Sequence, residues 1–567
     1  MRIHALPHCL CFCVLLLGVT TAEGAPPSDA ALRAAATYAY AHVRGQSGNW
    51  PRPEDKPLPA VVFISVGRHR EVAKVTVGRA DTLGQAVERA LTACGADPAA
   101  EVVRLDIVTQ QTDPAPWHGG LPGWQAGEGV ALLFGEGGQE RVWLLPDELI
   151  ARDLVDYDTD QLRLGRLDAY LRGKRAKVYQ SYEAPAAFVR FRTHGVAVTA
   201  EGVFPPAKAP EHAMLRARLA GRYLASVVQE DGEFVYEYDA DRDRPESGYN
   251  MLRHAGSSFA MAQLLRADPN SAAIRPALDR AVAYMKSEMA QSEDGTQAVL
   301  LDKGNVKLGG NGLALLALSE YSVASGTTHH LELARKLARW IAANQETSGR
   351  FKVHKMHWET KTVSDFRSGY YPGEAAFGLV RLYELTKEEK WLDVAYLAAR
   401  YTGRRLLKDG RIVPGEHDHW LLYALDHIHR HRPDEEFLES AREIVKAIQR
   451  TQHSVQDDNI NPSWFGGWYQ PPRYTPASTR CEGLGAAYRM FQRAKDAKSA
   501  TMARETLNAG IAFLNRGQIG PDRALFFPDP ERVLGGVSGG ITNMDIRVDY
   551  PQHALSAWLA HSRITAE

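Results

Sequence analysis

Helical periodicity dominates the chain from about residue 210 onward, and the predicted helices come in pairs. The first helix of each pair has an apolar face and a charged face, so one of its sides needs water. The second helix is apolar on nearly all sides and rich in Gly and Ala, which is typical of a buried helix. The first helices are predicted at 211–229, 273–289, 330–345, 391–407, 435–451 and 500–517. The second helices are predicted at 250–265, 309–321, 371–385, 417–428, 478–491 and 550–561.

The alternation of these two helix types predicts two concentric rings. Six apolar helices inside six amphipathic ones would bury the first set and hydrate the second, and small residues would let the inner helices pack closely. The pairs are unevenly spaced, with long connections at 346–370 and 452–477, which argues against a regular solenoid. We therefore predict a mainly α fold, an (α/α)6 double-ring toroid over residues 213–565, with functional loops at one rim.

Residues 31–203 show a different pattern, with short strands in place of long helices. Strands are predicted at 60–67, 71–78, 100–110, 129–135, 141–146 and 186–200. A helix is predicted at 81–94, with Asp81 as its N-cap. These elements predict a smaller α+β domain of unknown role, and the Pro-rich segment 204–212 after it is typical of a linker.

The paired helices resemble the (α/α)6 toroid superfamily, which includes six-hairpin glycosidases, polysaccharide lyases, uronate C5-epimerases and sugar 2-epimerases. The resemblance covers residues 213–565 and rests on architecture, not on one motif. It implies a site in the central funnel, at the loops that enter the inner helices. The element order in 31–203 resembles the AMMECR-like domain, although the glycine- and cysteine-bearing motif of that family is absent, and this resemblance implies no particular function.

Composition and charge exclude some classes of protein. The 567 residues are 44% hydrophobic and 24% charged, which suits a globular protein, and a formal net charge of -1 gives no basic field for nucleic acid. Arg2, the apolar run from Cys9 to Val19 and the small residues up to Ala22 form the pattern of a secretory signal peptide, residues 1–22. We therefore expect export to the periplasm or the extracellular space, and no later stretch is apolar and long enough to span a membrane.

The cysteines add no disulfide framework. Cys9, Cys11 and Cys13 would leave with the signal peptide, so that Cys94 and Cys481 remain. These two lie far apart along the chain, and we expect two buried thiols in preference to one disulfide.

Polar residues gather where the predicted inner helices begin. Because these helices run in the same direction, their starts and their positive dipole ends would meet at one mouth. The substrate-binding candidates are Arg253, Asn250, Asn311, Arg367, Tyr370, Asp418, His419, Trp420, Arg480, Arg547, Trp464 and Trp468. The two last tryptophans lie in the loop 463–474, whose aromatic faces would stack on sugar rings if exposed.

Each of these residues also has a purely structural interpretation. Pro372 suits the first turn of a helix, and Glu374 after it could complete a cap. A cap needs only one polar residue, whereas several polar residues meet at each helix start. Burying so many polar groups costs about 1–3 kcal/mol each unless they are paired. A wet binding pocket explains their convergence best.

Two chemistries are compatible with these residues. Glycoside hydrolysis needs one protonated and one ionised carboxyl group, which Glu374 and another acid could supply. Lyase or epimerase chemistry needs a base beside a uronate carboxylate and a cation that stabilises the enolate. The catalytic candidates are Glu374, Tyr371, His254, Glu482, His553 and Asp549. The arginines at the mouth could hold an anionic sugar or could pair with local acids.

The sequence predicts neither a metal nor a cofactor. His417 with His419, or His354 with His357, has no third ligand at a diagnostic spacing. The basic residues of segment 427–436 are expected to cap the end of an inner helix. We therefore predict a carbohydrate-active enzyme that acts on a poly- or oligosaccharide by hydrolysis or by proton abstraction at a uronate. The alternative is a non-catalytic polysaccharide-binding or scaffold protein of the cell envelope.

Overall fold

The computed structural model describes residues 27–565, except 47, 49–56, 69–70, 136–139, 157–160, 180–184, 207–211, 408–416 and 458–459. Packing divides the chain into two compact units, with the boundary between Phe204 and Pro205. The predicted signal peptide, residues 1–22, lies outside the described residues. None of the described helices has both the length and the hydropathy needed to cross a membrane. Cys94 and Cys481 are free, buried thiols, as predicted.

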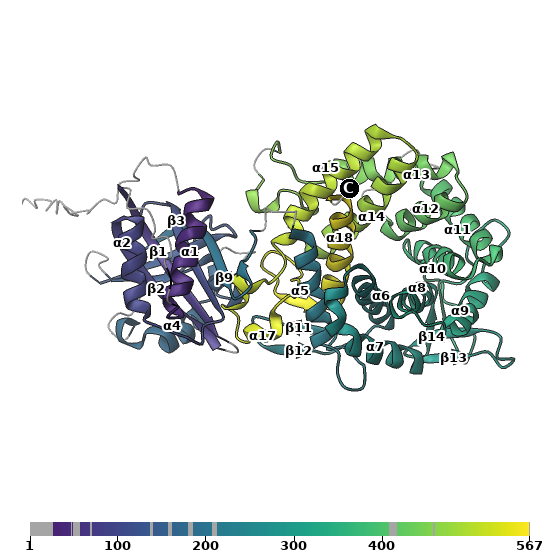
Figure 1. The fold of residues 1–567 in the computed structure, drawn as a ribbon, viewed down its shortest axis with the longest axis horizontal. Coiled ribbons are helices and arrows are strands. Elements are labelled where there is room, and N and C mark those ends of the chain that lie inside the picture. Colours follow the sequence, from purple (N-terminus) through teal and green to yellow (C-terminus); the bar gives the residue numbers. More distant parts are fainter. Residues whose placement is uncertain are drawn as a thin grey trace, which may run out of the picture. The chain divides into compact units, whose positions relative to one another are not determined.

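The first unit is built on a mainly antiparallel sheet (Figure 1). Its strands are β1 (Pro57–Arg68), β2 (Glu71–Thr82), β3 (Val102–Gln111), β4 (Ala115–Pro116), β5 (Glu128–Phe134), β6 (Glu140–Leu144), β9 (Ala187–Thr199) and β10 (Gly202–Val203). The strand order is β2-β1-β3-β9-β5-β6, and β4 and β10 also pair with β9. The pairs β1–β3, β3–β9, β9–β5 and β5–β6 are antiparallel. All the strands predicted for this region are therefore confirmed.

Helices α1 (Asp29–Val43) and α2 (Leu83–Cys94) pack on this sheet and against each other. Their apolar faces share one core with β1 and β3, with Leu32 and Leu105 among its members. Helix α1 was not predicted from the sequence, and the predicted N-cap of α2 was wrong. The Thr82 hydroxyl, not Asp81, caps α2 by accepting a hydrogen bond from the Gln85 amide at 3.2 Å. The remaining elements of this unit are α3 (Pro146–Ala151), β7 (Val155–Asp156), β8 (Gln161–Leu162) and α4 (Leu164–Tyr179).

The described part of the second unit contains twelve long helices, which alternate between an outer and an inner position (Figure 1). Two short helices, α16 (Pro521–Ala524) and α17 (Pro530–Val533), precede the last inner helix. The outer helices are α5 (Ala213–Ser226), α7 (Arg275–Ser287), α9 (Leu331–Ala343), α11 (Glu389–Leu407), α13 (Glu435–Arg450) and α15 (Ala497–Asn515). The inner helices are α6 (Met251–Ala267), α8 (Leu308–Ser325), α10 (Tyr371–Thr386), α12 (His419–His431), α14 (Tyr474–Arg493) and α18 (Asp549–Thr565).

The inner helices close into a ring. Helix α6 packs on α8, α8 on α10, α10 on α12, α12 on α14, α14 on α18, and α18 returns to α6. The outer helices pack on this ring from outside, for example α15 on α14 and α5 on α18. Glycines permit the close approach, because a Cβ at Gly312 would lie 2.6 Å from the backbone carbon of Glu374 on the next inner helix. The predicted (α/α)6 toroid is therefore confirmed.

Short strands interrupt the connections between helices, where the sequence analysis expected none. Strands β11 (Glu237–Asp239), β12 (Arg244–Glu246) and β17 (Asp545–Arg547) form one small sheet, in the order β12-β11-β17. Strands β13 (Met289–Gln291), β14 (Ala298–Asp302), β15 (Asn305–Lys307) and β16 (Lys355–His357) form another. Most are only three residues long, too short to show an alternating pattern. Among them, β15 and β17 lead directly toward inner helices and fix where those helices start.

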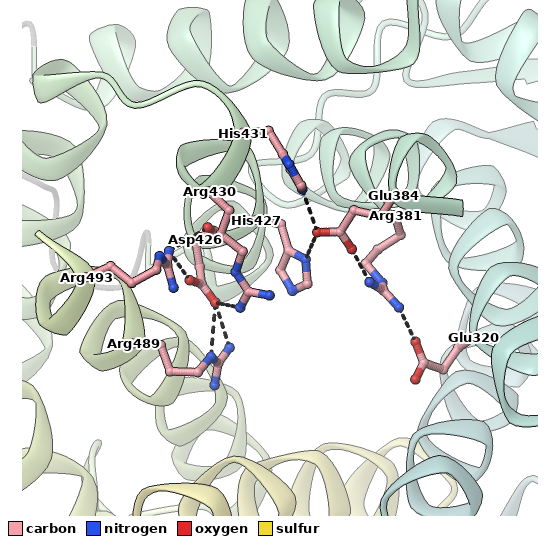
Figure 2. A network of polar contacts seen from close by, with 9 residues as sticks. All are labelled: Glu320, Arg381, Glu384, Asp426, His427, Arg430, His431, Arg489 and Arg493. Atoms are coloured by element: carbon pink, nitrogen blue, oxygen red, sulfur yellow. Dashed lines mark hydrogen bonds and ion pairs between the residues drawn. The ribbon is translucent and has the colours of Figure 1, made fainter. Parts of the chain in front are cut away.

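An ion network joins the carboxyl-terminal halves of neighbouring inner helices (Figure 2). On α10, Arg381 binds Glu320 of α8 at 2.8 Å and also pairs with Glu384 of its own helix. Glu384 accepts contacts from His427 of α12 at 2.8 Å and from His431 at 3.2 Å. Segment 427–436 was predicted to cap the end of this helix, and His431 does lie in its last turn. Both histidines also contact a carboxylate on α10, which the sequence did not predict.

Asp426 of α12 continues this network to α14. Its fully buried carboxylate accepts hydrogen bonds from Arg489 at 2.8 Å, from Arg493 at 2.5 Å and from Arg430 at 3.0 Å (Figure 2). Burial alone would raise the pKa of Asp426, but the surrounding cations outweigh burial and lower it. The network thus holds the ring at the carboxyl ends of the inner helices and leaves the amino ends for a site.

Candidate functional site

A cavity of about 360 Å³ lies at the amino ends of the inner helices. Every inner helix named above, or the residues just before it, contributes to its wall. The lining residues are Leu252, Arg253, Leu313, Tyr370, Glu374, His417, His419, Trp420, Tyr469, Arg473, Thr475, Pro476, Thr479, Arg480, Gly539, Arg547, Asp549, Tyr550, Gln552 and His553. The structure therefore brings together nine of the candidates named from the sequence: Arg253, Tyr370, Glu374, His419, Trp420, Arg480, Arg547, Asp549 and His553.

Two histidines and a buried glutamate form a cluster at this cavity. His553 on α18 contacts Oε1 of Glu482 on α14 through Nδ1 at 3.0 Å. Nε2 of His419, the first residue of α12, lies 3.8 Å from the other oxygen of Glu482. The two imidazole rings are 5.3 Å apart and nearly perpendicular. Glu482 itself does not line the cavity, and its fully enclosed carboxyl group supports His553 from behind.

His419 is the least satisfied polar group of the cluster. Within the described part of the chain, neither of its ring nitrogens has a hydrogen-bond partner, although its side chain is only 5% exposed. Burial and the neighbouring His553 and Arg480 lower the pKa of His419 well below its usual value, so its imidazole is neutral at neutral pH. Burial also raises the pKa of Glu482, against the opposing effect of His553. A neutral, unpartnered imidazole at a cavity wall is able to accept a proton from a ligand.

Glu374 occupies a second polar site, on the wall formed by α10. Its Oε2 is buried and has no hydrogen-bond partner among the described residues. Burial, and then the nearby carboxyl group of Asp418, raise the pKa of Glu374 well above its usual value, so that it is protonated at neutral pH. Gly309 on α8 makes room for this carboxyl group, because a Cβ at that position would overlap Oε2.

Asp418 lies behind Glu374 and does not line the cavity. It is the N-cap of α12, and its Oδ1 accepts a hydrogen bond from the Leu421 amide at 3.1 Å. Its Oδ2 is buried without a partner in the part of the chain that is described. Burial raises the pKa of Asp418 to about 8, although the helix amides oppose this change. Glu374 and Asp418 are therefore two acids that the fold keeps largely neutral.

Four arginines line the cavity, and the structure separates them into two kinds. Arg547 binds Asp549 through two nitrogens, at 2.6 and 3.1 Å, and Arg253 lies 3.1 Å from the same carboxylate. Asp549 is thus held by two guanidinium groups and is not free to act as a base. Arg473 and Arg480, at the start of α14, have no carboxylate within ion-pair distance among the described residues.

The cluster of His419, Glu482 and His553 is also a group of the described residues that could hold a metal. One ligand atom from each residue lies within 4.8 Å of the other two, and two imidazoles with a carboxylate form a donor set that zinc accepts. The spacing along the chain gave no hint of this group, because its members come from three different inner helices.

Three candidates named from the sequence have structural partners outside the cavity. His254 is fully buried, and its ring nitrogens contact the Tyr249 hydroxyl at 2.7 Å and the Ala281 carbonyl at 2.8 Å. Asn250 caps α6 through the Leu252 amide. Asn311 accepts a hydrogen bond from the Leu300 amide at 2.9 Å and donates one to the Lys307 carbonyl at 2.8 Å. Their hydrogen-bonding groups are used inside the protein, and none of the three lines the cavity.

The remaining candidates also lie outside the cavity lining. Trp468 is buried, and its indole donates to the Ile448 carbonyl at 2.9 Å, so it does not stack from an exposed loop as expected. Trp464 packs against His453. Tyr371 stacks on His354, and burial with the charge of Glu374 raises its pKa to about 12. Arg367 is exposed and donates to the backbone carbonyls of Ser364 and Phe366.

Several cavity residues were not among the candidates named from the sequence, chiefly at the start of α14. Tyr469, Arg473, Thr475 and Pro476 line the cavity, as does His417 just before α12. The sequence did point to this region, because the loop 463–474 is aromatic and ends directly at an inner helix. The tryptophans of the loop were chosen because aromatic faces stack on sugar rings, but in the structure Tyr469 is the aromatic residue of this loop that lines the cavity.

Comparison with known proteins finds solved structures that are similar to part of this chain. No protein-family model matches the sequence, and no curated protein shows a significant match. A structure of D-mannose isomerase is 15% identical and superimposes with a TM-score of 0.46, over 64% of this chain and 99% of its own. Cellobiose 2-epimerase from Bacillus thermoamylovorans is 10% identical, with a TM-score of 0.46 over 60% and 95% of the two chains. An unsaturated glucuronyl hydrolase specific for heparin is 14% identical, with a TM-score of 0.42 over 63% and 98%.

Proposed function

We propose that this protein is a sugar-modifying enzyme that moves a proton at a carbon next to a carbonyl or carboxylate group. The observation that carries the proposal is the pair of imidazoles from His419 and His553 at the wall of one cavity, 5.3 Å apart. Proton abstraction of this kind is the step shared by sugar isomerases, epimerases and uronate lyases. The polar wall and the volume of about 360 Å³ suit a ligand of one or two sugar rings.

His419 is the best candidate for the base. Its low pKa keeps the imidazole neutral, and no protein group occupies its nitrogens among the described residues. A neutral imidazole accepts a proton from carbon when the resulting negative charge is delocalised onto an adjacent oxygen. The resulting imidazolium would lie close to Glu482, whose oxygen is 3.8 Å from Nε2 of His419.

His553 is the second proton carrier. Its Nδ1 is held by Glu482, so the other ring nitrogen, Nε2, is the one available at the cavity. Two imidazoles from different helices permit removal of a proton by one and delivery by the other. If both act on one carbon, the product is an epimer, and if they act on adjacent carbons, the product is an isomer.

Glu374 is the acid in this scheme. Because its raised pKa keeps it protonated, its hydroxyl donates a hydrogen bond to the oxygen on which negative charge develops. This assignment also explains its buried, unpartnered Oε2, which is costly unless a ligand completes its hydrogen bonding.

Solvent exchange tests the proposal. The purified protein is incubated in deuterium oxide with a panel of free aldoses, 2-ketoses and uronate-terminated oligosaccharides, and incorporation at carbon is followed by NMR. We expect exchange or interconversion with at least one sugar, lost in His419→Asn and in His553→Asn. Exchange that survives in both variants would remove the imidazoles from the mechanism.

The pH dependence of kcat/KM is a second test. A base with a pKa well below 6.5 is neutral above that value, so activity should stay on a plateau from pH 6 to 8 and fall only in more acidic solution. A rate that drops sharply between pH 7 and 6 would instead indicate an unperturbed histidine.

Glycoside hydrolysis is the second candidate function, favoured by the protonated Glu374 at the cavity wall. It also needs an ionised carboxylate across the scissile bond, and Asp549, which lines the cavity, is occupied by two arginines. Release of reducing ends from polysaccharides, abolished in Glu374→Gln, would favour it. Retained binding with neither hydrolysis nor exchange would favour a polysaccharide-binding protein. We further propose that the protein is exported, on the evidence of the predicted signal peptide alone.

A further inference from the structure

We infer that the ligand of this cavity carries a negative charge, and that Arg480 and Arg473 at the start of α14 bind it. The inference deepens the proposed function and rests on it only in taking the ligand to be a sugar. It therefore predicts an acidic sugar, in which a carboxylate, phosphate or sulfate group lies at this part of the wall.

Arg480 is a buried cation that has no carboxylate partner among the described residues. Its side chain is only 6% exposed, and no carboxylate among the described residues lies within ion-pair distance. Its terminal nitrogens donate to the Pro476 carbonyl at 3.0 Å and to the Tyr469 hydroxyl at 3.2 Å. Both partners are neutral. Burying a charge without a counter-ion is expensive, and an anionic ligand would supply the missing charge.

The surroundings hold Arg480 in one orientation. Its guanidinium lies 4.9 Å from the ring centre of Tyr469 and 5.6 Å from that of Trp468. The two hydrogen bonds use one N–H on each terminal nitrogen, so each nitrogen keeps a second N–H for a ligand. A guanidinium fixed in this way binds the two oxygens of a carboxylate with little loss of freedom.

Arg473 adds a second cation at the mouth of the cavity. Its guanidinium lies 5.3 Å from the ring centre of Tyr469, so one tyrosine ring has both arginines as neighbours. Arg473 immediately precedes α14, whose first residues Thr475 and Pro476 also line the cavity. The positive end of this 20-residue helix therefore adds to the same field.

The charges of the whole wall agree with an anionic ligand. Arg253 and Arg547 share the single carboxylate of Asp549, so this group of three has a surplus of one positive charge. Glu374, the other acid of the wall, is held in its neutral form. With Arg473 and Arg480 added, the lining residues have a clear excess of positive charge.

Calorimetry with matched sugars tests this inference. The methyl glycoside of glucuronic acid is compared with that of glucose, and glucose 6-phosphate and glucose 6-sulfate distinguish a planar from a tetrahedral anion. Because a hydrogen-bonded ion pair is worth about 1.5–3 kcal/mol, we expect at least one acidic sugar to bind about 10- to 100-fold more tightly than the neutral one. Equal affinities, or no binding of any acidic sugar, would overturn the inference.

Variants assign the preference to these residues. Arg480→Gln should abolish most of the preference for the acidic sugar. Arg480→Lys should retain only part of this preference, because lysine lacks the planar guanidinium group that donates two parallel hydrogen bonds. Arg473→Gln, at an exposed position, keeps the inference testable if the buried variant does not fold. Arg504→Gln, on an exposed part of outer helix α15, is the matched control and should bind like the wild type. An unchanged preference in folded Arg480→Gln and in Arg473→Gln would also overturn the inference.

The two proposals fail in different ways. If acidic sugars bind through Arg480 but no proton exchange occurs, the proton-transfer function is wrong and the charge inference stands. If a neutral sugar is exchanged and no acidic sugar is preferred, the charge inference is wrong and the function stands.

Discussion

Asp418 allows the electrostatics of the site to be tested through stability. The replacement Asp418→Asn keeps the shape of the side chain and an oxygen that caps α12, because asparagine is about as good an N-cap as aspartate. The replacement removes an ionisable group that is buried, and one of its oxygens has no hydrogen-bond partner in the described part of the chain. The variant therefore isolates the cost of charging this site.

The effect of Asp418 on stability depends on the difference between its folded and unfolded pKa values. The folded pKa of Asp418 is about 8, above the unfolded value of 3.8, so the folded state binds the proton more tightly. Stability from this group is fully present below pH 3.8 and is lost as the pH rises toward 8. At about 1.4 kcal/mol per pH unit, the loss by pH 7 is on the order of 4 kcal/mol. Asp418→Asn should recover much of this at pH 7 and almost none near pH 4.

Thermal unfolding followed by circular dichroism between pH 4 and pH 8 is the assay. The difference in Tm between Asp418→Asn and wild type should grow with pH. Asp434→Asn is a matched control, since Asp434 is the half-buried N-cap of the neighbouring outer helix α13 and accepts the Tyr396 hydroxyl. A constant difference across the pH range, or destabilisation by Asp418→Asn at every pH, would refute the reasoning.

Four further outcomes are expected. Asp426→Asn leaves three arginines without their shared anion and should lower the free energy of unfolding by about 3–5 kcal/mol in denaturant titration. The control Asp393→Asn breaks an exposed pair with Arg432 and should cost less than about 1 kcal/mol. Gly309→Ala places a methyl group against the Glu374 carboxyl and should lower kcat strongly while secondary structure persists in circular dichroism. Dialysis against EDTA should leave activity unchanged, because the proposed proton transfer uses free imidazoles. Added Zn²⁺ should inhibit the enzyme by binding His419, Glu482 and His553. A loss of activity on dialysis that only metal restores would refute the metal-free mechanism. Mass spectrometry of exported protein should show a mature chain that begins after Ala22, and an uncut amino terminus would contradict export through this signal.

The charged residues of the site show the limit of reasoning along the chain. The four arginines that line the cavity carry the same formal charge, and their positions in the sequence do not show which of them pair with an acid. The fold gives Arg253 and Arg547 one aspartate to share, whereas the partners of Arg480 among the described residues are a carbonyl and a hydroxyl group. Histidines behave in the same way, since His254 is enclosed by its own hydrogen bonds and His419 is left open at the cavity wall.

The sequence by itself determined the double ring and the end of the ring at which a site could form. The helical periodicity of a segment and its apolar or amphipathic character can be read from that segment alone, and they predict which helices must be buried. The tertiary structure alone decided which polar side chains meet, because His419, Glu482 and His553 come from three helices and their contacts depend on small rotations and shifts of each. Which acids stay protonated was decided in the same way, since burial and neighbouring charge, not residue type, set the pKa values of Glu374 and Asp418.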